Sequence, residues 1–150
     1  MTDARMPDDE PSRCNCARIR RAARTVTRYY DSCLAPAGIG ANQFTILGYL
    51  KHRGPLRMQA LGDLLAMDRA TIGHNLRPLE RDGLLRIEVD PDDRRARLVA
   101  VTAAGLAKID QARGFWDEAQ RTFETTFGRT EAAGLRLMLD AVADTKLAEA

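Results

Sequence analysis

The chain has 150 residues, of which 45% are hydrophobic and 29% charged, as expected for one folded domain with short arms and not for a disordered chain. Its apolar runs are too short to cross a membrane and its acidic N-terminus is unlike a secretory signal, so we expect a cytoplasmic protein without a membrane partner. Three cysteines and two histidines disfavour a disulfide scaffold and a histidine-rich metal site, so we predict neither a metal nor another cofactor.

The N-terminal third of the chain predicts an acidic disordered arm over residues 1–12, followed by two helices. From Cys14 to Leu34 apolar residues recur every three or four positions and form one seam along a helix. Six arginines and no acidic residue lie between positions 13 and 28, which makes this helix strongly basic. A second helix is expected over 42–51, before the breaking pair Gly54-Pro55.

The middle of the chain predicts two helices joined by a three-residue turn and followed by a β-hairpin. The first helix covers 58–65, with Arg57 as a weak N-cap, and the second covers 69–82, with Asp68 as a good one. Alternating apolar residues indicate strands at 84–89 and 97–101, with a loop of about seven residues between them.

Two further helices complete the predicted order of elements. Thr102 should cap a long helix that runs to Phe127, and Thr130, after the interruption at Gly128, should cap the last one. The predicted fold class is mainly α with a small β-hairpin (α+β): a winged helix-turn-helix over 36–101, intertwined with a helical dimerisation region over 13–35 and 102–150.

This order of elements predicts binding to double-stranded DNA. The second helix of such a pair enters the major groove with its N-terminal end first, while Ile72, Leu76 and Leu79 should face the core. Arginine and asparagine can form bidentate contacts with guanine and adenine, and arginines suit the electronegative minor groove at a hairpin tip. Asp93 should structure the wing. The predicted DNA-binding residues are Arg69, Thr71, His74, Asn75, Arg77, Arg94, Arg95 and Arg97.

The stretch from Asp93 to Gly105, DRRARLVAVTAAG, resembles the wing signature of the MarR (multiple antibiotic resistance regulator) family, with every fixed position of that pattern filled. Upstream, LGDLL from Leu61 and the segment from Asp68 to Leu84 resemble the helix-turn-helix of the same family. The resemblance covers about residues 14–148. It implies a homodimeric transcriptional regulator, usually a repressor and not an enzyme, that binds a pseudo-palindrome and releases it when a small, often aromatic ligand enters.

The apolar seam of the first helix and the aromatic stripe of the long helix also favour a homodimer, because the small wing region cannot cover both. The alternative is that the two form a core within one chain. The arginines of the first helix can form an ordinary solvated basic face. Alternatively, they can hold an anionic effector, such as an aromatic carboxylate or an acyl thioester, by arginine forks. The predicted ligand-binding residues are Ile19, Arg20, Ala23, Phe44, Leu47 and Trp116.

An alternative sensor is Cys16, which resembles the reactive cysteine of the organic-hydroperoxide-sensing branch of the family. Tyr30 falls where that branch has a cysteine-contacting tyrosine, but two further tyrosine positions hold Arg20 and Ala41 here. Arginines beside Cys16 at the start of a helix should favour its thiolate, with Cys14 or Cys33 as a resolving thiol. Equally, Cys16 and Cys33 can serve as small hydrophobic residues of the seam. Two rivals from other classes, a protein-interaction module and a thiol peroxidase, explain the hairpin less well.

Overall fold

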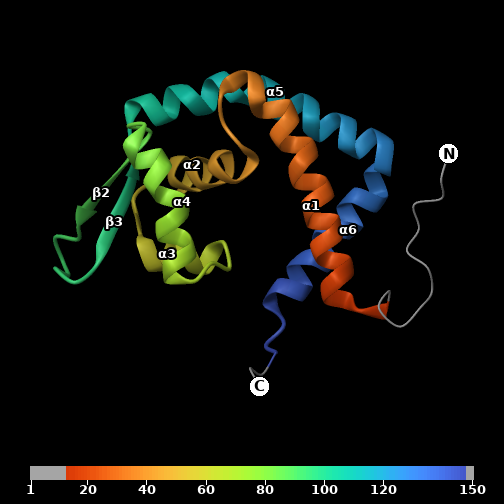
Figure 1. Ribbon diagram of the computed structural model, residues 1–150, viewed down its shortest axis with the longest axis horizontal. Helices are drawn as coiled ribbons and strands as arrows, with labels where there is room; N and C mark the ends of the chain where they lie inside the picture. The colour runs from red at the N-terminus through yellow and green to blue at the C-terminus, as the bar shows by residue number, and fades with distance from the viewer. Residues whose placement is uncertain (1–12, 148–150) are drawn as a thin grey trace.

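The computed structural model describes residues 13–147, so the predicted arm over 1–12 lies outside the described residues. The chain forms an arch in which helix α5 (Ala103–Phe127) runs along the top (Figure 1). Helix α6 (Arg129–Asp144) descends from the C-terminal end of α5, and α1 (Asn15–Leu34) descends beside it from near the middle of α5. The strands and the shorter helices hang from the other end. No helix between residues 13 and 147 is both long and apolar enough to span a membrane.

The compact half holds the predicted helix pair and hairpin. After the short 3-10 turn η2 (Ala35–Ala37) come α2 (Ala41–Arg53), α3 (Met58–Leu64) and α4 (Arg69–Arg81). Strands β2 (Leu85–Val89) and β3 (Arg97–Val101) then form the hairpin, with the expected seven-residue loop.

The sheet has one strand more than the sequence predicted. Strand β1 (Leu56–Arg57) pairs antiparallel with β3, so the order is β1-β3-β2 and β3 is central. Because two residues are too few to show an alternating pattern, the sequence did not predict β1. Through β1 the hairpin is attached directly to the start of α3.

The main hydrophobic core lies in this half and includes the end of α1 and the first half of α5. Its fully buried large side chains come from α1 to α5 and from strands β2 and β3. Because Ile109 of α5 packs among them, α5 is fixed to the helix-turn-helix. These side chains are Leu34, Ile46, Leu47, Leu50, Leu61, Ile72, Leu76, Leu79, Leu85, Val99 and Ile109.

The sequence predicted the N-cap of α5 correctly and that of α6 wrongly. Thr102 caps α5 as predicted, because its side-chain oxygen accepts a hydrogen bond of 3.1 Å from the backbone nitrogen of Gly105. The predicted cap at Thr130 is wrong: α6 begins at Arg129, and Gly128 occupies the N-cap position with φ 109°. A positive φ of this size suits glycine, which has no Cβ to clash, so the turn between the helices is made at Gly128 itself.

Candidate nucleic-acid interface

Helix α4 presents one apolar and one polar face, as its sequence predicted. Ile72, Leu76 and Leu79 are buried against the core. Asp68 caps the helix: its carboxylate accepts a hydrogen bond of 2.7 Å from the backbone nitrogen of Thr71, and this bond lowers the pKa of Asp68. The opposite face is exposed to solvent and carries four of the predicted DNA-binding residues, Arg69, Thr71, His74 and Arg77.

Asn75, which we predicted to contact adenine, is half-buried and already engaged within the protein. Its Nδ2 donates a hydrogen bond of 2.8 Å to the carbonyl oxygen of Thr71, and its Oδ1 accepts one of 2.5 Å from Nδ2 of Asn42. The side chain therefore ties α4 to α2 in the free protein. A bidentate contact with a base requires Asn75 to exchange these partners for the base edge.

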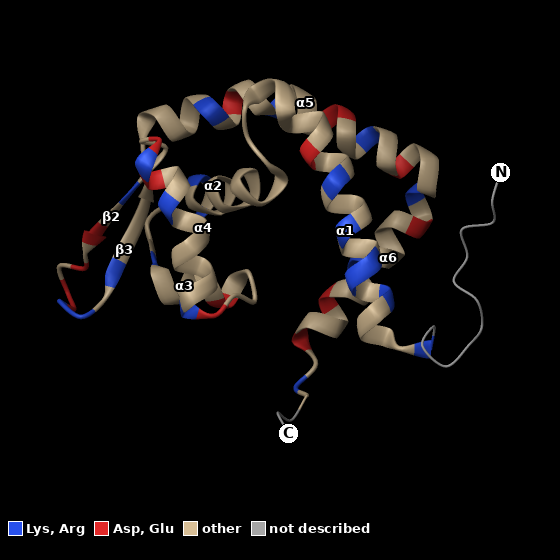
Figure 2. Ribbon diagram, viewed as in Figure 1, with Lys and Arg blue, Asp and Glu red and all other residues tan. Residues whose placement is uncertain are grey.

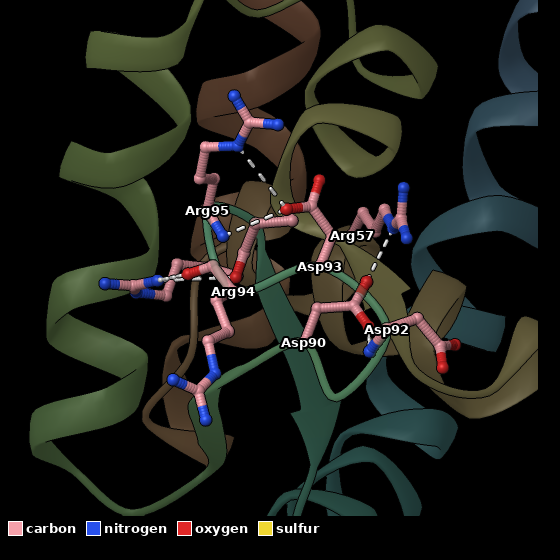
Figure 3. A network of polar contacts seen from close by, with 8 residues as sticks. Arg57, Asp90, Asp92, Asp93, Arg94 and Arg95 are labelled. Carbon is pink, nitrogen blue, oxygen red and sulfur yellow. Dashed lines mark hydrogen bonds and ion pairs between the residues drawn. The ribbon is translucent and has the colours of Figure 1, made fainter.

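The loop between β2 and β3, residues 90–96, is built by hydrogen bonds to aspartate oxygens. Asp93 accepts a hydrogen bond of 3.0 Å from the backbone nitrogen of Arg95 at its side chain and one of 2.9 Å from Ala96 at its carbonyl oxygen. Arg94 and Arg95 are exposed at the tip, with the Arg95 side chain 97% accessible (Figure 3). Arg97 folds back, and its Nη1 donates to the carbonyl oxygens of Arg94 and Ala96 at 3.4 and 3.3 Å.

Sequence reasoning missed the pair Arg57–Asp90, which joins this loop to the start of α3. Asp90 is 3% exposed, and its Oδ2 accepts a hydrogen bond of 2.6 Å from Nε of Arg57 (Figure 3). The backbone nitrogen of Asp92 and the Arg57 guanidinium together hold the pKa of Asp90 below its usual range. The sequence offered one signal, an arginine at the N-cap position of a predicted helix, where arginine is a poor cap. In the structure Arg57 indeed makes no side-chain cap bond.

A cavity of about 640 Å³ lies between the hairpin loop on one side and α3, the turn after it and the N-terminal end of α4 on the other. Arg57, Asp63, Asp68 and Arg69 line it on the helical side, and Asp93, Arg95 and Arg97 line it from the hairpin. The cavity thus lies between the two groups of residues predicted to reach DNA. Basic residues also mark the hairpin and α1 in the charge view (Figure 2).

The six predicted effector residues do not gather at one place within a protomer. Phe44 and Trp116 stack with ring centroids 5.9 Å apart, while Leu47 is fully buried in the core. Ile19, Arg20 and Ala23 lie on the exposed N-terminal half of α1, which Figure 1 shows beside α6 and away from α2.

Arg113 is the basic residue that the structure brings to the aromatic pair, and sequence reasoning did not single it out. Its guanidinium carbon lies 5.8 Å from the ring centres of both Phe44 and Trp116. This arrangement places a cation beside two stacked rings between α2 and α5, of which Phe44 is buried and Trp116 half-buried.

Cys16 and Tyr30 do not meet within one protomer. Cys16 is exposed at the start of α1, and Tyr30 follows it by fourteen positions along the helix, an axial distance of about 21 Å. Tyr30 instead donates a hydrogen bond of 2.6 Å to Oε1 of Gln120 on α5, and burial raises its pKa. The redox hypothesis at Cys16 thus remains a prediction. No group of three or more His, Cys, Asp or Glu between residues 13 and 147 is arranged to hold a metal ion.

Comparisons with known proteins agree with this arrangement. The transcriptional regulator MOSR of M. tuberculosis, solved in complex with DNA, is 30% identical and superposes with a TM-score of 0.72 over 86% of this chain and 98% of its own. Two curated bacterial regulators match over 92 residues, or 61% of this chain: HTH-type transcriptional regulator MhqR of Bacillus subtilis, 25% identical, and HTH-type transcriptional repressor NicR of Pseudomonas putida, 29% identical.

This chain covers 63% of the length of MhqR and 58% of that of NicR, less than two thirds of each. All three similar proteins are regulators and not enzymes. The MarR family model matches residues 37–96, which span α2, the helix pair, β2 and the loop of the hairpin. With the winged helix-turn-helix and the similarity to MOSR over nearly its full length, this match establishes that the chain belongs to the MarR family.

Proposed function

We propose that the protein is a cytoplasmic DNA-binding transcriptional repressor that acts as a homodimer on a pseudo-palindromic operator. The observation that carries the proposal is the pairing of an exposed polar face on α4 with an arginine-tipped hairpin, both anchored in one core. An α-helix fits the major groove, and exposed arginines suit the adjacent minor groove. We infer that residues 69–82 form the recognition helix and residues 85–101 the wing.

Two groups of side chains divide the work in this proposal. Arg69, His74, Asn75 and Arg77 would contact bases and phosphates in the major groove, and Thr71 in the first turn a phosphate or a thymine methyl group. Arg94, Arg95 and Arg97 would contact the minor groove and its phosphates. Asp93 would hold the wing loop in shape through its bonds to Arg95 and Ala96.

The dimer proposal is supported by apolar surface on the helices outside the main core. Leu137, Met138, Leu139 and Val142 on α6 are 46–72% exposed, and Phe127 at the end of α5 is 51% exposed. Adjacent exposed apolar side chains on this scale mark a surface that another protein covers. A second copy related by a two-fold axis would bury them and would place two copies of α4 on one DNA duplex.

The proposed effector site has fewer residues than the sequence predicted. We infer that a planar aromatic or anionic ligand would bind beside Phe44 and Trp116, with Arg113 as its cationic partner. Because α5 joins this cluster to both the proposed recognition unit and the proposed dimer helices, a ligand there would change the separation of the two copies of α4.

The test is selection of duplexes from a random DNA pool, followed by fluorescence anisotropy titration of the best duplex and of a scrambled version. We expect an affinity for the selected duplex at least about a thousandfold greater than for the scrambled one. Failure to enrich any sequence, or equal affinity for both duplexes, would count against a sequence-reading regulator.

A further inference from the structure

Among the described residues, Asp90 is the one charged residue that is buried. Its two carboxylate oxygens have different partners. Oδ1 accepts a hydrogen bond of 2.9 Å from the backbone nitrogen of Asp92, inside the wing loop. Oδ2 accepts the 2.6 Å bond from Arg57, outside the hairpin. A buried carboxylate is strongly destabilising unless it is paired and hydrogen-bonded, so both partners are needed for Asp90 to stay charged in this position.

Arg57 is placed to act on the wing and not on its own helix. Its backbone belongs to β1, opposite Leu98, and it occupies the N-cap position of α3 without making a side-chain cap bond. Arginine is a poor N-cap, so the choice of residue is not explained by the start of α3. It is explained by Asp90, which a guanidinium can reach while its other nitrogens remain exposed.

The ion pair joins the wing loop to β1, the strand that leads directly into α3. No other hydrogen bond between residues 13 and 147 joins loop 90–96 to the helices of the helix-turn-helix. The cavity of about 640 Å³ lies on the boundary between the loop and the helices, with Arg57 among its lining residues. Among the described residues, the Arg57–Asp90 pair is therefore the side-chain contact that holds the loop across this boundary.

We propose that Arg57 is a positioning residue for DNA recognition: by pairing with Asp90 it fixes the wing tip relative to helix α4. This inference rests on the proposed function. Arg69 on α4 and Arg94 and Arg95 on the wing must reach one duplex at the same time. Holding the two elements at a fixed separation reduces the entropy cost of binding DNA, so the pair increases affinity without touching DNA.

A competing role for Arg57 is direct contact with a DNA phosphate, since its side chain is 50% exposed. The two roles differ in what they require of Asp90. Direct contact needs only Arg57, whereas positioning needs both members of the pair. Neutralising Asp90 also removes a negative charge near DNA, which would by itself strengthen binding, so weaker binding by D90N reflects lost bonds of Asp90, to Arg57 or to the backbone of Asp92. Only loss of the bond to Arg57 predicts that the effects of R57M and D90N are not additive.

The experiment measures full-length R57M, D90N and the double variant against the duplex selected by the wild-type protein. We expect each single variant to bind about tenfold more weakly and the double variant no more weakly than either, because all three lack the same tie. Hydroxyl-radical footprinting should show minor-groove protection by the wing reduced, while protection of guanine N7 in the major groove persists. R57K, which keeps a cation, should bind within about threefold of wild type.

K51M is the matched control, because Lys51 on α2 pairs with Asp110 on α5 at 2.8 Å, outside both the proposed recognition helix and the wing. It should bind and protect DNA as the wild type does. Wild-type affinity of D90N alongside a weakened R57M would overturn positioning in favour of direct contact. Wild-type footprints from both variants would overturn any role in wing placement.

If R57M lowers the thermal unfolding midpoint, R57Q takes its place under the same expectations, and wild-type binding by folded R57Q again contradicts the proposal. A wild-type protein that selects no DNA would refute the proposed function itself, an outcome separate from both of these.

Discussion

At the residue scale, Asp68 shows how one side chain starts the recognition helix. Its bond from the backbone of Thr71 satisfies a donor that the helix leaves open and lowers the pKa of the carboxyl. A carboxyl whose pKa is lower in the folded than in the unfolded protein stabilises the fold above the unfolded value of about 3.9. That stabilisation is lost as the pH falls through the folded value.

We therefore predict that D68A lowers the free energy of unfolding at pH 7 and has less effect at pH 3. D68S is the control, because serine caps a helix without titrating in this range. It should keep most of the stability at pH 7 and show a shallower decline in acid. Urea unfolding at several pH values measures both, and equal acid sensitivity of wild type and D68S would refute the assignment.

Asn75 was predicted to read DNA from its type and position, but its partner Asn42 could not be foreseen. The two are 33 positions apart in sequence, and no local pattern pairs them. We expect N75A to bind the selected duplex about 10-fold to 100-fold more weakly while affinity for scrambled DNA changes little, because alanine cannot form the bidentate bond to a base and the phosphate-binding residues are unchanged. Competition titrations with both duplexes measure this, and a parallel weakening on both would contradict base reading by Asn75.

At the element scale, Gly105 explains the glycine in the motif that ends the wing. A Cβ at Gly105 would collide with the carbonyl oxygen of Leu84 and would lie 2.7 Å from Cγ2 of Val101. The first turn of α5 therefore rests directly on the turn that precedes β2, where Thr102 also donates a hydrogen bond of 2.6 Å to the carbonyl oxygen of Gly83. Only glycine permits this close approach of helix and hairpin.

We predict that G105A lowers the free energy of unfolding by about 1–3 kcal/mol, the usual effect of overpacking. Gly114 in the same helix provides the control, since a Cβ there meets nothing within 4 Å. G114A should raise the free energy of unfolding by about 0.5–1 kcal/mol, because alanine favours a helix interior. Urea denaturation measures both variants. Similar effects of the two substitutions would show that the close approach to Leu84 does not limit residue 105.

Elements with a strong periodic pattern were predictable, and elements set by distant contacts were not. The inward face of α4 follows from Ile72, Leu76 and Leu79, because their spacing fits one side of a helix. Strand β1 exists only because β3 offers it a partner, and the Arg57–Asp90 pair exists only because β1 brings those residues together. Of the candidate effector residues, Phe44 and Trp116 meet through packing of α2 on α5, which no sequence spacing between them encodes.

At the scale of the whole molecule, the exposed apolar side chains of α6 predict that the protomer is incomplete. L137E with M138E would place two charges where a second copy should pack, and burial of unpaired charge is strongly unfavourable. We expect this variant to sediment as a monomer at micromolar concentration and to bind the selected duplex at least about a hundredfold more weakly, because a monomer reaches only one half-site. Leu106, 38% exposed at the far end of α5, supplies the control. A dimeric L137E/M138E variant, or a monomeric L106E, would contradict the proposed interface.

In the proposed complex, α4 and the wing together hold the DNA. The most direct measurement is the affinity for the selected duplex over a salt series, for wild type and for R94A/R95A. Neutralised phosphates release counterions, so the logarithm of affinity should fall steeply and linearly with the logarithm of salt concentration for wild type. We predict weaker binding and a clearly shallower slope for R94A/R95A, by up to about one unit for each phosphate that the variant no longer neutralises. Identical slopes and affinities for the two proteins would contradict the account.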